Sequence, residues 1–264
     1  MESILRVLDT QMTQPTPYGW FHILCLVLTV LATVLLCRFG KKWPPRKVVL
    51  ITAVLVTVLE VYKQINYSFS YENGIAFDYQ WYAFPFQFCS TPMYVGLLGS
   101  LLKKGKLQSA CFAYLATYAV FAGVCVMLYP VTVFIGTVGI NIQTMICHGS
   151  MIVIGVWLLY TGTVKVTHRS ILKAIPVFAV CVGMAVVMNE IAHSTGLLER
   201  ETFDMFFISP YGTPSLPVYS LVQGVVPFPW CLVIYIAAFS VAAYLMLLIA
   251  LGVKSLAGKK KVKV

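Results

Sequence analysis

Cys89 and His148 are the residues of this chain whose types and placement could support covalent chemistry. Cys89 lies in the stretch FPFQFCSTPMY, between Pro85 and Pro92. Proline suits the first turn of a helix and bends a helix further along. We therefore expect Cys89 in the first turns of a helix, where the helix dipole favours a thiolate. His148, at a similar depth on another predicted helix, could accept the thiol proton and so activate the nucleophile.

The same spacing also fits a cysteine with no chemical role. Most cysteines in apolar segments are small packing residues, and equal depth along two helices does not establish contact. All eight cysteines fall within apolar segments, which argues against a framework of disulfides between loops. The histidines show no spacing typical of metal ligands. We therefore expect no metal site and no cofactor.

The apolar runs that carry these residues predict an all-α membrane protein. Of the 264 residues, 59% are hydrophobic and 11% are charged, whereas a soluble domain is about 25% charged. Runs of about 20 apolar residues can cross ~30 Å of hydrocarbon as helices. We predict a polytopic membrane helix bundle with seven transmembrane helices, at residues 19–38, 48–67, 84–102, 107–129, 143–163, 171–192 and 228–252.

Lys and Arg gather on one side of this predicted bundle, after the first, third, fifth and seventh helices. The positive-inside rule places the N-terminus outside and the C-terminus inside. We expect an extracytoplasmic segment at 1–18, a transmembrane domain at 19–252 with an outer loop at 193–227, and a basic cytoplasmic tail at 253–264. The net charge of +10 is then a topology signal and not a nucleic-acid surface. We expect a multi-pass protein of the bacterial cytoplasmic membrane.

Polar side chains are expected at one depth near the outer ends of the predicted helices. Glu60, Lys63, Gln64 and Tyr67 are spaced i, i+3, i+4 and i+7 and share one helix face. Asn189 and Glu190 fall at a similar level, and Cys89 and His148 are each about five residues, or ~8 Å, inside. Ionisable groups in spans usually face a bundle interior or a wet cavity. We expect a polar cavity open to the outer leaflet, although Glu60 and Lys63 also fit a self-neutralising structural pair.

Three stretches resemble a known family. FPFQFCSTPMY resembles the P-x-[QH]-x-C-S motif of the YwaF-like bacterial integral membrane proteins, a family that includes the eukaryotic transmembrane protein 164. CHGSMIVIGVWLL resembles the family's histidine-led fifth helix, and FFISPYGTPSLPVYSLVQGVVPFPW resembles its outer loop. The loop departs from the family pattern, because DMFFISPYGTP stands where Asn-Tyr and Lys-Pro are more common. The resemblance implies acyl transfer between phospholipids, with Cys89 and His148 at the positions of the catalytic cysteine and histidine.

Together these features predict a membrane-embedded thiol acyltransferase or lipid hydrolase that acts on phospholipid-type acyl esters near the outer leaflet. His148 would deprotonate Cys89, and the thiolate would form a thioester that a lyso-lipid or water resolves. The candidate oxyanion donors are Gln64, Gln87 and Asn189. Glu60 or Glu190 could orient His148, and Lys63 could favour the thiolate. The expected partners are membrane lipids, and no nucleic acid.

Two other classes of function fit the same sequence. A small transporter or channel would use the polar cavity for passage, since the Glu60–Lys63 pair and proline-broken helices suit such proteins. Transporters tend to have internal repeats and a site at the membrane midplane, whereas the sequence shows no repeat and an off-centre polar layer. A non-catalytic lipid-binding or scaffold protein is the third class, in which Cys89→Ser would change stability alone.

Overall fold

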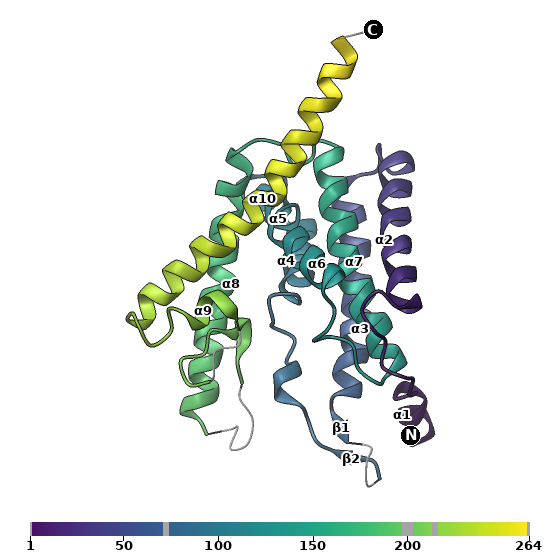
Figure 1. Cartoon of the computed structure of the whole chain (residues 1–264), viewed down its shortest axis with the longest axis vertical. Helices are drawn as coiled ribbons and strands as arrows, with labels where there is room; N and C mark the ends of the chain where they lie inside the picture. Colours follow the sequence, from purple (N-terminus) through teal and green to yellow (C-terminus); the bar gives the residue numbers. More distant parts are fainter. Residues whose placement is uncertain (1, 71–73, 197–202, 213–215, 263–264) are drawn as a thin grey trace.

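The protein is a bundle of helices, described here from a computed structural model that covers residues 2–70, 74–196, 203–212 and 216–262 (Figure 1). The helices are α1 (Glu2–Leu8), α2 (Trp20–Phe39), α3 (Pro45–Asn66), α4 (Thr91–Leu101), α5 (Lys106–Leu115), α6 (Tyr118–Leu128), α7 (Val138–Tyr160), α8 (Arg169–Ser194), α9 (Pro217–Ser220) and α10 (Phe228–Val262). Two 3-10 turns, η1 (Trp81–Ala83) and η2 (Met205–Phe207), and a two-stranded hairpin, β1 (Phe69–Ser70) with β2 (Ala76–Phe77), complete the described elements. In the hairpin Phe69 pairs with Phe77 and Ser70 with Ala76, antiparallel.

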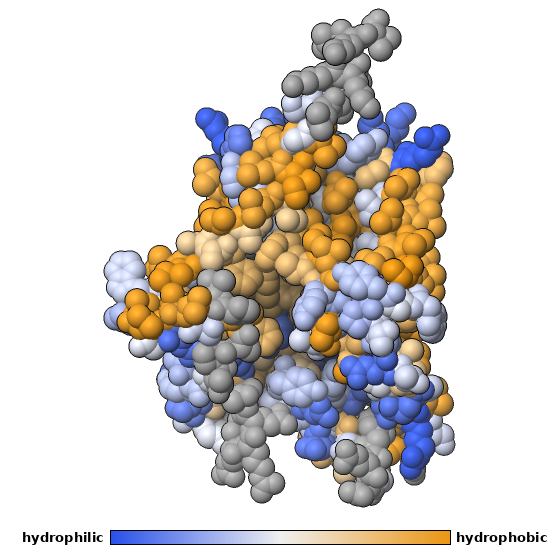
Figure 2. Space-filling model, viewed as in Figure 1, coloured by the Kyte–Doolittle hydropathy of each residue, from blue (hydrophilic) through white to orange (hydrophobic). Residues whose placement is uncertain are grey.

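Within the described residues, six helical stretches are long and apolar enough to cross a membrane. They are Trp20–Phe39, Pro45–Asn66, Lys106–Leu128, Val138–Tyr160, Arg169–Ser194 and Phe228–Ser255. Figure 2 shows a broad apolar band across the face in view, with hydrophilic side chains gathered towards its two ends. The prediction of an all-α polytopic bundle is confirmed at this level.

The third predicted helix, 84–102, is wrong in its first half. Helix α4 begins at Thr91 and has 11 residues, which gives ~16 Å of helix and cannot cross a bilayer. Pro92 lies at the second position of α4, where its missing N–H costs no hydrogen bond, so it starts the helix instead of bending it. Cys89 therefore lies in a non-helical segment before α4 and not in the helix's first turns.

The fourth predicted helix, 107–129, is broken into α5 and α6. Thr117 has non-helical angles (φ −129°, ψ −75°), and its hydroxyl donates a 2.7 Å hydrogen bond to the carbonyl of Ala113. Helix α7 approaches this break closely at Gly155. A Cβ there would lie 2.7 Å from the backbone oxygen of Leu115. The glycine thus lets α7 approach the backbone at the break more closely than any side chain would allow.

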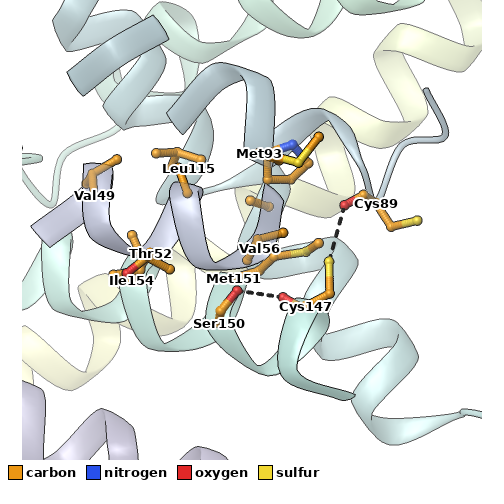
Figure 3. Close-up of a pocket in the computed structure, with 13 residues that line it drawn as sticks. Val49, Thr52, Val56, Cys89, Met93, Leu115, Cys147, Ser150, Met151 and Ile154 are labelled. Carbon is orange, nitrogen blue, oxygen red and sulfur yellow. Dashed lines mark hydrogen bonds between the residues drawn. The ribbon is translucent and has the colours of Figure 1, made fainter. Parts of the chain in front are cut away.

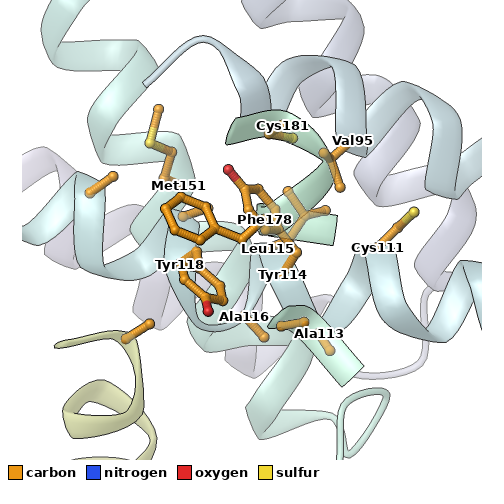
Figure 4. Packing of buried hydrophobic residues seen from close by; sticks show 14 of the residues in the cluster. Val95, Cys111, Ala113, Tyr114, Leu115, Ala116, Tyr118, Met151, Phe178 and Cys181 are labelled. Carbon is orange, nitrogen blue, oxygen red and sulfur yellow. The ribbon is translucent and has the colours of Figure 1, made fainter. Parts of the chain in front are cut away.

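Aromatic side chains form the centre of the bundle beyond the break. Tyr118 stacks on Phe178 with ring centroids 4.4 Å apart, and Tyr235 and Phe239 pack on the other side of Phe178. Figure 4 shows Phe178 seated against Tyr118 and Leu115. Offset and tilted ring pairs of this kind add stability beyond their burial. These ring contacts join α6, α8 and α10.

Three contacts bring the basic connections to one end of the bundle. The indole of Trp157 donates to the carbonyl of Gly40 at 3.2 Å. Arg46 Nε donates to the carbonyl of Ser100 at 2.8 Å. Lys173 Nζ donates to the hydroxyl of Ser109 at 3.4 Å. The α2–α3, α4–α5 and α7–α8 connections therefore share one end, while the hairpin and η2 lie towards the other (Figure 1).

Candidate functional site

A buried carboxylate, Glu60, joins α3 to α7. Its side chain pairs with Lys63 Nζ at 2.7 Å, one turn further along α3. The same carboxylate accepts hydrogen bonds from Gln64 Nε2 at 2.8 Å and, across to α7, from Gln143 Nε2 at 3.4 Å. An ion pair removed from water needs such extra partners, because desolvation of two charges costs several kcal/mol. The predicted shared face of α3 is therefore present, and it points into the bundle.

The outer part of this network reaches the segment between β2 and α4. Gln64 Nε2 also donates to the carbonyl of Ala83 at 2.8 Å, and the Tyr79 hydroxyl donates to Gln64 Oε1 at 2.6 Å. Burial, and then the negative charge of Glu60, raises the pKa of Tyr79 to about 12, so the phenol remains protonated at neutral pH. Both N–H groups of the Gln64 amide are donated within this network.

His148 is held in one tautomer with an unused nitrogen. It is 5% exposed, and its Nδ1 lies 2.8 Å from the carbonyl oxygen of Thr144. A carbonyl can only accept, so Nδ1 carries the proton and Nε2 carries the lone pair. Nε2 is buried and has no hydrogen-bond partner among the described residues. Such unpaired buried groups are rare, and one with a free lone pair is suited to accept a proton.

Cys89 lies beside α7, at Cys147, the residue that precedes His148. The Cys147 thiol is 3.9 Å from the carbonyl oxygen of Cys89, and Figure 3 shows the Cys89 sulfur turned away from Cys147. Because Nε2 of His148 has no partner, the thiol–imidazole hydrogen bond is not formed in this state. Lys63 is close enough to act electrostatically on both Cys89 and His148. Direct contact between the Cys89 sulfur and the His148 imidazole stays a prediction.

A small apolar cavity adjoins Cys89. It has a volume of about 30 Å³, room for one or two waters. Its wall includes Val56 from α3, Met93 from α4 and Met151 from α7 (Figure 3). Cys89 thus lines a space walled by hydrocarbon side chains, while its sulfur points away from the other labelled residues of the wall (Figure 3).

The site is deeper than the sequence suggested. Helix α7 begins at Val138, five residues before the predicted start at 143, so His148 is about ten residues inside, or ~15 Å and not ~8 Å. The early start follows from Asn141, whose amide bonds to both the N–H and the carbonyl of Ile135. With its polar groups satisfied by the preceding loop, this turn remains helical. Depth along α7 therefore places His148 near the middle of the helix.

Gln87 and Asn189 hold the outer loop. Gln87 donates to the carbonyl of Asp204 at 2.9 Å and accepts from the N–H of Phe206 at 2.9 Å. Asn189 donates to the carbonyl of Met205 at 3.1 Å and accepts from its N–H at 2.8 Å. These paired bonds support a strained backbone, since Phe206 has φ of +63°. Their amides therefore have a structural role here, whereas an oxyanion role would require these bonds to break.

Glu190 is not part of the site. It is exposed and accepts a 2.6 Å hydrogen bond from the Tyr211 hydroxyl. Because the Nδ1 partner of His148 is the Thr144 carbonyl, neither Glu60 nor Glu190 orients the imidazole through a hydrogen bond, contrary to our expectation. The orienting group is the backbone of the preceding helical turn.

Sequence reasoning missed Gln143, Thr144 and Tyr79. Gln143 stood at the expected start of a helix, where a polar side chain is usually solvated, and Tyr79 belonged to an aromatic stretch with no periodic signal. Another histidine, His22, is fully buried and has both ring nitrogens engaged, with the N–H of Tyr18 and the carbonyl of Met127. The described part of the chain has no group of three or more potential metal ligands.

The comparisons with known proteins agree with the sequence motifs. A family model described as the TMEM164 family matches residues 17–247. No curated protein and no solved structure matches the chain.

Proposed function

The chain belongs to the TMEM164 family and is an integral, multi-pass membrane protein, and on this premise we propose that it is a thiol acyltransferase or lipid hydrolase acting on phospholipid-type acyl esters. The observation that carries the proposal is His148, whose Nε2 lone pair is buried and unpaired on α7, one residue along the chain from the Cys147 thiol that contacts the Cys89 carbonyl. A second support is the non-helical backbone of the segment that carries Cys89. Non-helical backbone is tolerated at membrane depth only where protein covers it or a cavity borders it.

In the proposed reaction one nitrogen, Nε2 of His148, takes up and returns a proton in each of two steps. After rotation of the Cys89 side chain, Nε2 of His148 takes the thiol proton, and the sulfur attacks the ester carbonyl carbon. The C–S bond forms, the C–O bond breaks, and Nε2 returns the proton to the leaving alcohol. A lyso-lipid hydroxyl or water then attacks the thioester carbonyl and gives its proton to Nε2; the new C–O bond forms, the C–S bond breaks, and Nε2 returns the proton to the Cys89 thiolate. Lys63 supplies a positive charge near the reaction, although that charge is paired with Glu60 at 2.7 Å in this structure.

An acyl adduct on Cys89 is the expected result for protein purified from its native membrane. Intact-mass analysis should find a fraction of the protein heavier by one acyl group, with the added mass removed by hydroxylamine. Cys89→Ser should lack the adduct, whereas Cys147→Ser should retain it, since Cys147 is the matched buried thiol on α7. An adduct that persists in Cys89→Ser, or no adduct in any preparation incubated with phospholipid, would contradict the proposed enzyme.

A transporter or channel is a second candidate function because ionisable side chains lie well inside the helix bundle. His148 lies near the middle of α7, and Glu60 and Lys63 form an ion pair inside the bundle at the level of Gln143; intramembrane ionisable groups of this kind are common in transport proteins. This function predicts solute flux into proteoliposomes that depends on Glu60 and not on Cys89. A non-catalytic lipid-binding protein predicts neither an adduct nor flux. Residence in the bacterial cytoplasmic membrane is part of the proposal.

We also propose seven crossings with the N-terminus outside, the third crossing being an irregular segment followed by α4. The shared end of the basic connections supports this, since Lys and Arg favour the cytoplasmic side. Reporter fusions after Lys106 and Lys173 should both read cytoplasmic. An extracytoplasmic reading at either position would overturn the orientation.

A further inference from the structure

A long apolar groove separates α2 from α3, with α7 as its floor. Its volume is about 740 Å³, within the range of small-molecule sites. The walls are aliphatic on all three helices, and include Leu28, Ala32, Ile51, Leu55, Ile146 and Val153. The groove is distinct from the small cavity at Cys89.

The groove faces the surroundings of the protein and not its core. Only 6% of the residues in the most apolar stretch of α2 are buried, so this helix touches the bundle along one edge. Trp20 and Trp43 line the two ends of the groove, and both are exposed. Tryptophan favours the membrane–water interface, so the pair marks a groove that runs across the hydrocarbon layer. In a membrane protein, the molecule available to fill such a groove is a lipid.

The charge at one end of the groove is complementary to a phospholipid head. Lys41 and Lys42 lie in the α2–α3 turn beside Trp43, and Lys47 follows in the first turn of α3. All three are exposed. A phosphate at that end would lie among ammonium groups while its acyl chain extended along the apolar walls.

The other notable feature of the groove is its contact with the Cys89 cavity. Thr52, Ser150 and Ile154 line both spaces. The neighbouring Gly149 has no side chain, and α2 approaches it so closely that a Cβ would lie 2.6 Å from the Thr29 hydroxyl. Thr52, Ser150 and Ile154 therefore form the partition between the groove and the Cys89 cavity, and two of these three side chains are small.

We propose that this groove binds a membrane phospholipid, with one acyl chain between α2 and α3 and its phosphate at the cations of the α2–α3 turn. Binding of the lipid does not depend on catalysis. The partition at Thr52 and Ser150 becomes the entry for an acyl chain to Cys89 only if the proposed function holds.

The test is photo-crosslinking in proteoliposomes with a phosphatidylcholine that carries a diazirine within one acyl chain. Peptide mass spectrometry should place the adducts on the groove-lining residues of α2, α3 and α7. Ala32→Trp, which fills the groove from α2, should reduce this capture about tenfold. Ile51→Trp should do the same from α3 and guards against a folding defect in one variant. The matched control is Leu31→Trp, an exposed α2 residue outside the groove, which should leave capture unchanged.

Three outcomes would overturn the inference. One is labelling spread evenly over the lipid-facing residues of α2, α8 and α10. Another is equal capture by Ala32→Trp and Leu31→Trp. The third is crosslinking of α2 to a second copy of the chain in place of lipid. Cys89→Ser should capture lipid as well as the wild type, so loss of the acyl adduct and loss of groove binding are separable results.

Discussion

Replacing His148 with glutamine is expected to slow the alkylation of Cys89 by about 10²-fold, the lower range for loss of a positioned base. The reason is the Nε2 lone pair, which is buried and unpaired while Nδ1 is fixed on the Thr144 carbonyl. A glutamine side chain can keep a hydrogen bond to that carbonyl but has no basic nitrogen. The measurement is the rate of labelling by a small, membrane-permeant maleimide at neutral pH, read for each cysteine by peptide mass spectrometry.

Two controls show whether the effect is specific to His148 and to Cys89. His168 lies in the connection between α7 and α8, where it contacts Tyr244. His168→Gln should therefore leave the rate of Cys89 alkylation unchanged. In the wild type, Cys89 should react before Cys147, which is buried with its thiol on the Cys89 carbonyl. Equal rates in wild type and His148→Gln, or uniform labelling of all cysteines, would return Cys89 to the role of a packing residue.

Glu60→Gln is expected to lower the free energy of unfolding by roughly 3 kcal/mol, because it removes one partner of a buried ion pair. The substitution keeps the size of the side chain but leaves the Lys63 ammonium without its counterion 2.7 Å away. The substitution also weakens the hydrogen bonds that Gln64 and Gln143 donate to the Glu60 carboxylate. Thermal unfolding in detergent, compared with wild type, measures the loss.

The double variant Glu60→Gln with Lys63→Met separates charge from packing. Without the lysine there is no uncompensated buried charge, so most of the lost stability should return. A double variant as unstable as Glu60→Gln alone would show that the pair acts through its hydrogen-bond network. No loss in Glu60→Gln would show that water reaches Lys63 freely, in conflict with the buried pair.

The sequence alone located the long apolar helices of this protein, although it extended the third predicted helix too far towards the N-terminus. Runs of about 20 apolar residues predicted α2, α3, α7, α8 and α10 to within a few residues at most ends, because hydrocarbon thickness sets helix length. The spacing of Glu60, Lys63 and Gln64 on one turn predicted their shared face, which the structure confirms. The motifs likewise predicted the family that residues 17–247 match.

Tertiary structure alone decided the features that depend on contacts between distant residues. Helix α4 starts late because the preceding segment takes other partners: Gln87, in that segment, bonds to backbone groups 117 and 119 residues away. The break between α5 and α6 lies where α7 comes close at Gly155. The same holds for Gln143 on Glu60, which joins residues 83 positions apart. Periodicity reports the faces of one helix, whereas the partners of an amide or the depth of a histidine follow from how several helices pack together.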